Sequence, residues 1–134
     1  MSTEPRILVV DDDHLTLTLL ARILRNEGFH FVEKANSGQA ALEKCLTSPP
    51  DIVFMDIEMP DLSGIETMQM MHDQGIPSLV VLVSASPLSQ YVMAAKQNNA
   101  AGFLVKPLSP KLVSDTIKKC MKHMHLEADE VKQA

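Results

Sequence analysis

Acidic, hydroxyl and basic side chains stand directly after four short apolar runs of the sequence. Asp11 to Asp13 follow the run ILVV, Asp56 follows DIVFM, Ser84 follows LVVLV, and Lys106 follows GFLV. If each run is a strand of an open parallel sheet, these side chains meet at the carboxyl ends of the strands, where such sheets bind ligands. The sequence therefore predicts a single site that combines carboxylates, a hydroxyl and an ammonium group.

This combination favours phosphoryl chemistry assisted by a metal ion. Carboxylates within a few ångströms of one another repel and require a counter-charge. Mg²⁺ is suitable because a hard divalent cation takes oxygen ligands in an octahedron and keeps several waters. A carboxylate oxygen of the partly neutralised cluster can attack a phosphoryl group. The ammonium of Lys106 and the hydroxyl of Ser84 can stabilise the transferred oxygens.

The elements that must position these residues are short strands and intervening helices. The apolar runs at 7–10, 51–55, 79–83 and 102–105 are uninterrupted rather than alternating, which is typical of strands buried on both faces of a parallel sheet. The run at 30–35 is more polar and predicts an edge strand. Each run is followed by a segment with helical features, so the order is β-α five times over.

The helical segments carry recognisable start and stop signals. Leu15 to Leu24 has helical spacing and stops at Gly28, although its first residues, LTLTL, also alternate as in a strand. Three further segments are predicted from residues that cap or open a helix, namely Ser37-Gly38, Ser63 with Glu66 in a capping box, and Ser109-Pro110. Leu88 to Asn98 is predicted as another helix. Together these units predict one open, doubly wound α/β domain with no linker of low complexity.

Composition restricts the class of partner. The chain has 134 residues, 46% of them hydrophobic, and a net charge of −5, which disfavours binding to nucleic acid phosphates or to an anionic membrane. Four Phe, one Tyr and no Trp offer little surface for stacking on single-stranded nucleic acid.

Cys45 and Cys120 have no metal-type spacing and indicate free thiols in a reducing compartment. With no secretory signal in the sequence, we expect a cytoplasmic protein.

Four motifs in order resemble the response-regulator receiver domain of two-component signalling, of the chemotaxis-regulator type. They are VVDDD (9–13), FMDIEMPDLSG (54–64), VSAS (83–86) and GFLVKP (102–107). The resemblance implies a flavodoxin-like, five-stranded parallel sheet with strand order 2-1-3-4-5 and helices on both faces. It also implies a receiver domain over residues 1–124.

The resemblance assigns roles to the residues at the strand ends. Asp56 is expected to form an aspartyl phosphate, and Lys106 to contact the phosphoryl group or the Asp56 carboxylate. Mg²⁺ is expected to bind the carboxylates of Asp12 and Asp56 and the backbone carbonyl of Glu58, and to bind Asp11 largely through water. The bond between Lys106 and Pro107 is expected to be cis.

The resemblance further implies a conformational switch. Ser84 is expected to move towards the phosphoryl group, which lets the ring of Phe103 turn inward, and Glu58 and Ser86 are expected to modulate the lifetime of the phosphoryl group. Phe103 departs from the tyrosine that many members carry, so it has no hydroxyl to present to a partner. Ser63 similarly replaces the aspartate that often precedes the glycine.

The last helix has two interpretations. From Pro110 it is predicted to reach the end of the chain, and Ile117, Met124 and Val131 recur every seven residues with Val113 and Cys120 between them. Residues 125–134 are therefore either a solvated helix end or an extension that dimerises or leads to an output domain. The expected partners are a histidine kinase or phosphotransfer protein, and an output domain or protein that contacts the last two helices and the fifth strand.

Two enzyme-like or cofactor-binding alternatives share this architecture. A Mg²⁺-dependent phosphatase with an aspartyl nucleophile resembles DxDxT after the first strand, whereas residues 11–15 read DDDHL. A flavin-binding domain needs a phosphate-cradling loop at that position, and three aspartates repel a phosphate. We therefore expect a signalling domain that catalyses only its own phosphorylation and autodephosphorylation.

Overall fold

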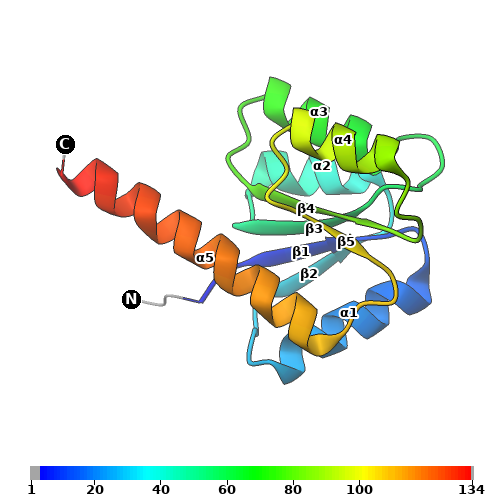
Figure 1. The fold of residues 1–134 in the computed structure, drawn as a ribbon, viewed down its shortest axis with the longest axis horizontal. Coiled ribbons are helices and arrows are strands. Elements are labelled where there is room, and N and C mark those ends of the chain that lie inside the picture. The colour runs from blue at the N-terminus through cyan, green and yellow to red at the C-terminus, as the bar shows by residue number, and fades with distance from the viewer. Residues whose placement is uncertain (1–3, 134) are drawn as a thin grey trace.

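The computed structural model describes residues 4–133, with side chains described as far as Met124, and it forms a doubly wound α/β domain (Figure 1). All strand pairs are parallel and the order is β2-β1-β3-β4-β5, as predicted. The strands are β1 (Ile7–Val10), β2 (Val32–Ala35), β3 (Ile52–Asp56), β4 (Leu79–Ser84) and β5 (Gly102–Val105). Asp56 and Ser84 are thus the last residues of their strands, rather than the first residues after them.

Four of the five helices begin after a residue whose side chain caps the first turn, whereas Leu88 before Ser89 makes no such hydrogen bond. The bounds of the helices are α1 (His14–Asn26), α2 (Gly38–Thr47), α3 (Gly64–Asp73), α4 (Ser89–Gln97) and α5 (Pro110–Gln133). Ser63 and Glu66 form the predicted capping box at the start of α3. The hydroxyl of Ser109 accepts a hydrogen bond from the backbone N–H of Leu112, at 3.1 Å, in the first turn of α5.

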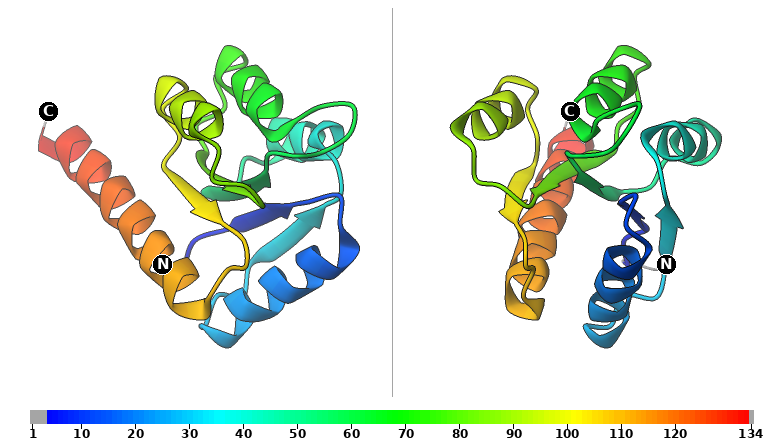
Figure 2. Two further views of the ribbon diagram at one scale, coloured as in Figure 1. Left: turned by 45° about the vertical axis from the view of Figure 1, so that its right-hand side comes forward. Right: turned by 90° about the vertical axis from the view of Figure 1, so that its right-hand side faces the viewer.

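The strand residues alternate between two apolar layers. Leu8, Val53 and Leu82 pack with α2, α3 and α4 on one face, whereas Val9 and Phe54 pack with α1 and α5 on the other. Figures 1 and 2 show these two helical layers on opposite sides of the sheet. Both faces of the central strands are buried, which explains why their sequences are uninterrupted apolar runs. β2 lies at the sheet edge and is mostly exposed, also as predicted.

The LTLTL segment forms the start of α1 and not a strand. Leu17 and Leu20 are buried, whereas Leu15 and Leu19 are 75% and 54% exposed. The burial pattern therefore follows the helical period.

The repeating apolar positions of α5 face the domain's own core. Val113 and Ile117 are completely buried and Cys120 is nearly so, all in the layer shared with α1. These positions therefore cannot form a seam with a second helix. The side chain of Val131 lies outside the described residues, and Figure 1 shows the last turns of α5 extending past the sheet. Cys45 and Cys120 are free, buried thiols.

Candidate functional site

Three carboxylates meet at the carboxyl ends of β1 and β3. Val10 and Met55 are paired in the register of these neighbouring strands, so Asp11 and Asp56 follow at adjacent positions. One carboxylate oxygen from each of Asp11, Asp12 and Asp56 lies within 4.8 Å of the others. Asp11 and Asp56 are buried, and Asp12 is exposed. The convergence predicted from the strand ends is therefore present.

Lys106 follows the edge strand β5, and its side chain contacts this cluster. Its Nζ lies 2.8 Å from Oδ2 of Asp11 and 3.2 Å from Oδ1 of Asp56. Its backbone N–H donates a hydrogen bond of 2.8 Å to the carbonyl oxygen of Ser84, which fixes the end of β5 against the end of β4. The bond from Lys106 to Pro107 is cis, as expected.

The charge balance of the cluster is unequal, because a single ammonium faces the three carboxylates. The pKa of Asp56 is raised to about 7, chiefly by burial and also by the negative charges of Asp11 and Glu58, while Lys106 opposes the change. Burial alone would lower the pKa of Lys106, but the hydrogen bond to Asp11 and the charge of Asp56 outweigh it, so the pKa of Lys106 is raised. The net charge of the cluster is therefore negative, which favours the binding of a further cation.

These residues fit a hard divalent cation. Oδ1 of Asp56 is buried without a hydrogen-bond partner, since the contact with Lys106 is an ion pair only. An unsatisfied buried carboxylate oxygen is costly, and a cation at this position would satisfy it. The carboxylates of Asp11, Asp12 and Asp56 are the oxygen ligands that Mg²⁺ prefers.

Asp13 has a different function from its two neighbours. Its side chain accepts hydrogen bonds from the backbone N–H of Leu15, at 3.3 Å, and from the hydroxyl of Thr16, at 2.6 Å. The Thr16 hydrogen bond holds the pKa of Asp13 below its usual value. Asp13 is therefore the N-cap of α1 and not part of the carboxylate cluster.

Ser84 is buried at the end of β4 and is held by Glu58. Its Oγ donates a hydrogen bond to Oε1 of Glu58 and accepts one of 3.0 Å from the backbone N–H of Ser86. The N–H of Ala85 lies 3.5 Å from Oε2 of the same carboxylate. The sequence motifs indicate a role for the backbone carbonyl of Glu58, but they give no sign that its carboxylate binds Ser84.

Ser84 and Phe103 lie on the same face of the sheet. Leu82 is paired with Phe103, and Ser84 with Val105, in the parallel register of β4 and β5. Side chains two residues apart in a strand point to one face. Phe103 is partly buried and packs against the layer that contains α2, α3 and α4.

Gly64 permits the tight connection between β3 and α3. A Cβ at this position would lie 2.1 Å from the carbonyl oxygen of Asp56 and 2.9 Å from Cγ of Met55. The N–H of Gly64 donates a hydrogen bond of 3.1 Å to the carbonyl oxygen of Ile57. The glycine therefore lets the start of α3 lie directly against the strand that carries Asp56.

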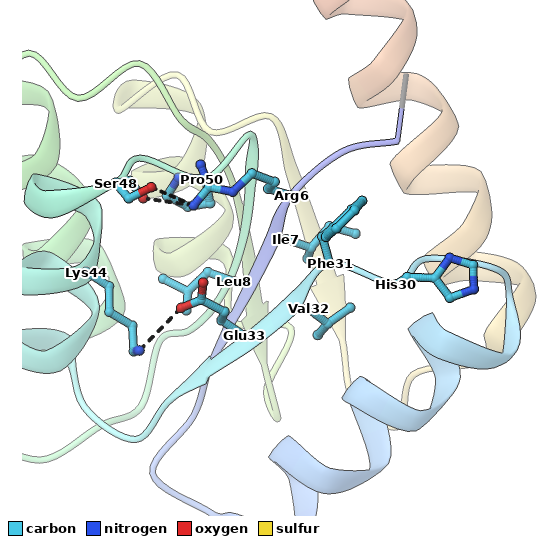
Figure 3. Close-up of a pocket in the computed structure, with 10 residues that line it drawn as sticks. All are labelled: Arg6, Ile7, Leu8, His30, Phe31, Val32, Glu33, Lys44, Ser48 and Pro50. Atoms are coloured by element: carbon cyan, nitrogen blue, oxygen red, sulfur yellow. Dashed lines mark hydrogen bonds and ion pairs between the residues drawn. The ribbon is translucent and has the colours of Figure 1, made fainter. Parts of the chain in front are cut away.

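A separate pocket of about 200 Å³ lies at the amino ends of β1 and β2 (Figure 3). Its charged side chains are paired with nearby groups. Arg6 donates to Oγ of Ser48 at 2.7 Å, and Lys44 lies 3.3 Å from Glu33. Figure 3 shows Arg6 turned towards Ser48 and Lys44 towards Glu33. This pocket is at the edge of the sheet opposite the carboxylate cluster, and its ionic groups do not converge on a ligand.

The fold and the cluster together define the class of domain. A doubly wound parallel sheet that carries an acidic cluster and a lysine at its carboxyl edge is the architecture of a signalling receiver. Residues 7–118 match the family model described as the response regulator receiver domain. The chain therefore belongs to the response regulator receiver domain family, and it is a signalling domain of the two-component type.

Two relatives support this assignment, and the chain covers nearly all of one and half of the other. The chain is 34% identical over 116 residues to the chemotaxis protein CheY of Bacillus subtilis, covering 87% of this chain and 97% of that protein. It is 32% identical over 123 residues to an uncharacterized response regulatory protein of Vibrio cholerae, covering 91% of this chain but 50% of the relative. The chain thus spans about half the length of that second relative.

Solved structures share the fold. A CheY-like receiver domain protein from Methanospirillum hungatei has a TM-score of 0.85 and 26% identity, covering 92% of this chain and 98% of that structure. The receiver domain of the putative response regulator NarL from Mycobacterium tuberculosis has a TM-score of 0.81 and 30% identity, covering 89% of this chain and 97% of that structure. Within the described part of the chain, no helix is long and apolar enough to cross a membrane.

Proposed function

We propose that this chain is a phosphorylation-dependent switch in which Asp56 accepts a phosphoryl group from a histidine kinase or a phosphotransfer protein. The observation that carries the proposal is the buried carboxylate of Asp56, whose Oδ1 has no hydrogen-bond partner and lies 3.2 Å from the Lys106 ammonium. The Asp56 carboxylate thus lies beside the Lys106 ammonium at the carboxyl ends of the strands. Such a group is suited to act as a nucleophile towards phosphorus.

The transfer conserves the phosphoryl group. The bond between phosphorus and the imidazole nitrogen of the donor breaks, its electron pair stays on the imidazole, and a carboxylate oxygen of Asp56 forms the new bond to phosphorus. Lys106 neutralises the charge of the transferred oxygens. Asp11, Asp12, Asp56 and the backbone carbonyl of Glu58 would hold Mg²⁺, which supplies further positive charge when bound.

The expected signal passes from Ser84 to the surface formed by α4, β5 and α5. Ser84 and Phe103 share one face of the sheet, so a displacement of the hydroxyl can change the space available to the ring. Apolar side chains are exposed nearby on these helices, with Leu88 and Met93 at α4 and Leu112 at α5. We propose that these residues contact an output domain or partner protein. Glu58 and Ser86 are proposed to set the lifetime of the phosphoryl group.

A second exposed apolar region supports docking of the donor protein. Leu15 and Leu19 are exposed on α1, and an adjoining groove of about 320 Å³ is lined by Leu19, Ile23, Lys106 and Pro107, among others. A donor bound here would bring its histidine close to the edge that carries Asp56.

We propose that these events take place in the cytoplasm, in keeping with the free thiols of Cys45 and Cys120.

Intact-mass analysis tests the proposal directly. Incubation with acetyl phosphate and Mg²⁺ is expected to add one phosphoryl group to the wild type and none to Asp56→Asn. Asp61→Asn is the matched control, because it removes an exposed carboxylate from the same β3–α3 connection. A wild type that stays unmodified with several small donors, or an Asp56→Asn variant modified to the same extent, would contradict the assignment.

A further inference from the structure

The carboxylate of Glu58 accepts the one hydrogen bond that the side chain of Ser84 can donate. Ser84 Oγ donates to Oε1 of Glu58 and already accepts a hydrogen bond from the N–H of Ser86. A serine hydroxyl has a single O–H donor. An oxygen of a phosphoryl group on Asp56 can receive that hydrogen only if Glu58 gives it up.

The two acceptors also compete through their charge. The negative charge of Glu58 contributes to the raised pKa of Asp56, so the two carboxylates repel each other. A phosphoryl group on Asp56 places further negative charge in the same space, and repulsion between like charges then disfavours the carboxylate of Glu58 at its present position. Glu58 is exposed, so its side chain can move into solvent without breaking the core.

From these contacts we infer that the Glu58 carboxylate is a latch on the switch, holding the Ser84 hydroxyl in the unphosphorylated state until a phosphoryl oxygen displaces it. Glu58 is thus a positioning residue that acts through Ser84, in addition to the expected role of its backbone carbonyl. The displacement rests on the proposed function, whereas the latch itself is a property of the unphosphorylated chain. Its release transfers one hydrogen bond from a carboxylate to a phosphoryl oxygen.

A first experiment examines the latch without metal or phosphoryl group. Amide chemical shifts of Ala85 and Ser86 are compared for wild type, Glu58→Ala, Ser84→Ala and the double variant. Glu58→Ala is expected to shift both amides, because they contact the carboxylate and the held hydroxyl. The shift of the Ser86 amide should be much smaller when Glu58→Ala is introduced into Ser84→Ala. Equal shifts in both backgrounds would overturn the latch.

A second experiment measures displacement with beryllium trifluoride, a phosphoryl analogue, in the presence of Mg²⁺. Removing Glu58 also removes a negative charge, which by itself favours an anionic analogue. The double-mutant cycle separates this effect from the loss of the hydrogen bond. We expect Glu58→Ala to raise the affinity about fivefold more when Ser84 is present than in Ser84→Ala, the scale of an exposed charge-assisted hydrogen bond.

Two further variants separate the charge of Glu58 from its hydrogen bond and provide a control at a distant exposed carboxylate. Glu58→Gln keeps an acceptor but loses the charge, so it is expected to give an intermediate Ser84-dependent gain. Glu27→Gln removes one exposed carboxylate at the end of α1 and is expected to change neither readout. A gain independent of Ser84 would assign Glu58 a purely electrostatic role. If wild type fails to bind the analogue, the proposed function fails, and the amide shifts still decide whether the latch exists.

Discussion

Lys106 joins the two ends of the site across the sheet: it follows β5, yet its Nζ lies 2.8 Å from Oδ2 of Asp11, which follows β1. In the order β1-β3-β4-β5, the side chain must pass over the ends of two intervening strands. Lys106 also lies 3.2 Å from Asp56. The same ammonium therefore bridges Asp11, a proposed metal ligand, and Asp56, the proposed phosphoacceptor.

Replacing this lysine should cost both stability and phosphorylation. Lys106→Met removes the ammonium that faces two buried carboxylates, so we expect a loss of about 1–3 kcal/mol in the free energy of unfolding at neutral pH without metal. Phosphorylation by acetyl phosphate should slow by about a hundredfold, since one stabilising charge on the transferred oxygens is lost.

Urea unfolding and intact mass measure these two effects. Lys44→Met is the control for stability, because Lys44 pairs with Glu33 on an exposed surface, and such pairs contribute about 0–1 kcal/mol. A Lys106→Met variant as stable and as readily phosphorylated as the wild type would show that the bridge has no energetic role.

The raised pKa of Asp56 predicts an unusual dependence of stability on pH. Its value of about 7 in the folded protein exceeds the ordinary value of about 3.9 in an unfolded chain. The folded state therefore binds more protons between these values, and its stability falls as the pH rises from about 4 to 7. Asp56→Asn removes this cost, so the variant should exceed the wild type by up to about 4 kcal/mol at pH 8 and nearly match it at pH 4.

Thermal unfolding in the presence of a chelator checks this difference. Asp61→Asn should follow the wild type at every pH, because Asp61 is exposed. Adding Mg²⁺ should stabilise the wild type more than Asp56→Asn, since the proposed Mg²⁺ site includes the Asp56 carboxylate of the folded state. A constant difference between wild type and Asp56→Asn from pH 4 to pH 8 would contradict the assigned pKa.

Gly64 supports the site by close backbone contact. In Gly64→Ala the new Cβ would lie 2.1 Å from the carbonyl oxygen of Asp56, so the backbone must shift. We expect a loss of about 2–3 kcal/mol in stability together with slower phosphorylation. Gly102→Ala is the matched control, because its Cβ would lie 3.5 Å from Val81 in ordinary contact. Equal effects of the two substitutions on urea unfolding would contradict the role of the β3–α3 contact.

The sequence predicted the sheet and the carboxylate cluster because both follow from local patterns. Strands buried on both faces leave apolar runs, and parallel pairing brings Asp11, Asp56 and Lys106 to one edge. The bond from Ser84 to Glu58 could not be predicted, since it depends on the direction of an exposed side chain in a loop. The apolar repeat of α5 was ambiguous, because the sequence cannot tell whether such a stripe faces the sheet or a second chain.

Ile117 distinguishes these two possibilities for α5 by experiment. Its side chain is fully buried in the layer shared with α1, so Ile117→Ala should lower the free energy of unfolding by about 2–4 kcal/mol. Because the lost contacts lie within one chain, this loss should be the same at all protein concentrations. Leu112→Ala, at an exposed position of the same helix, should cost less than about 1 kcal/mol. Urea unfolding over a range of concentrations measures both. A loss for Ile117→Ala that shrinks on dilution would show that this stripe supports a dimer instead, because dimerisation stabilises the wild type most at high concentration.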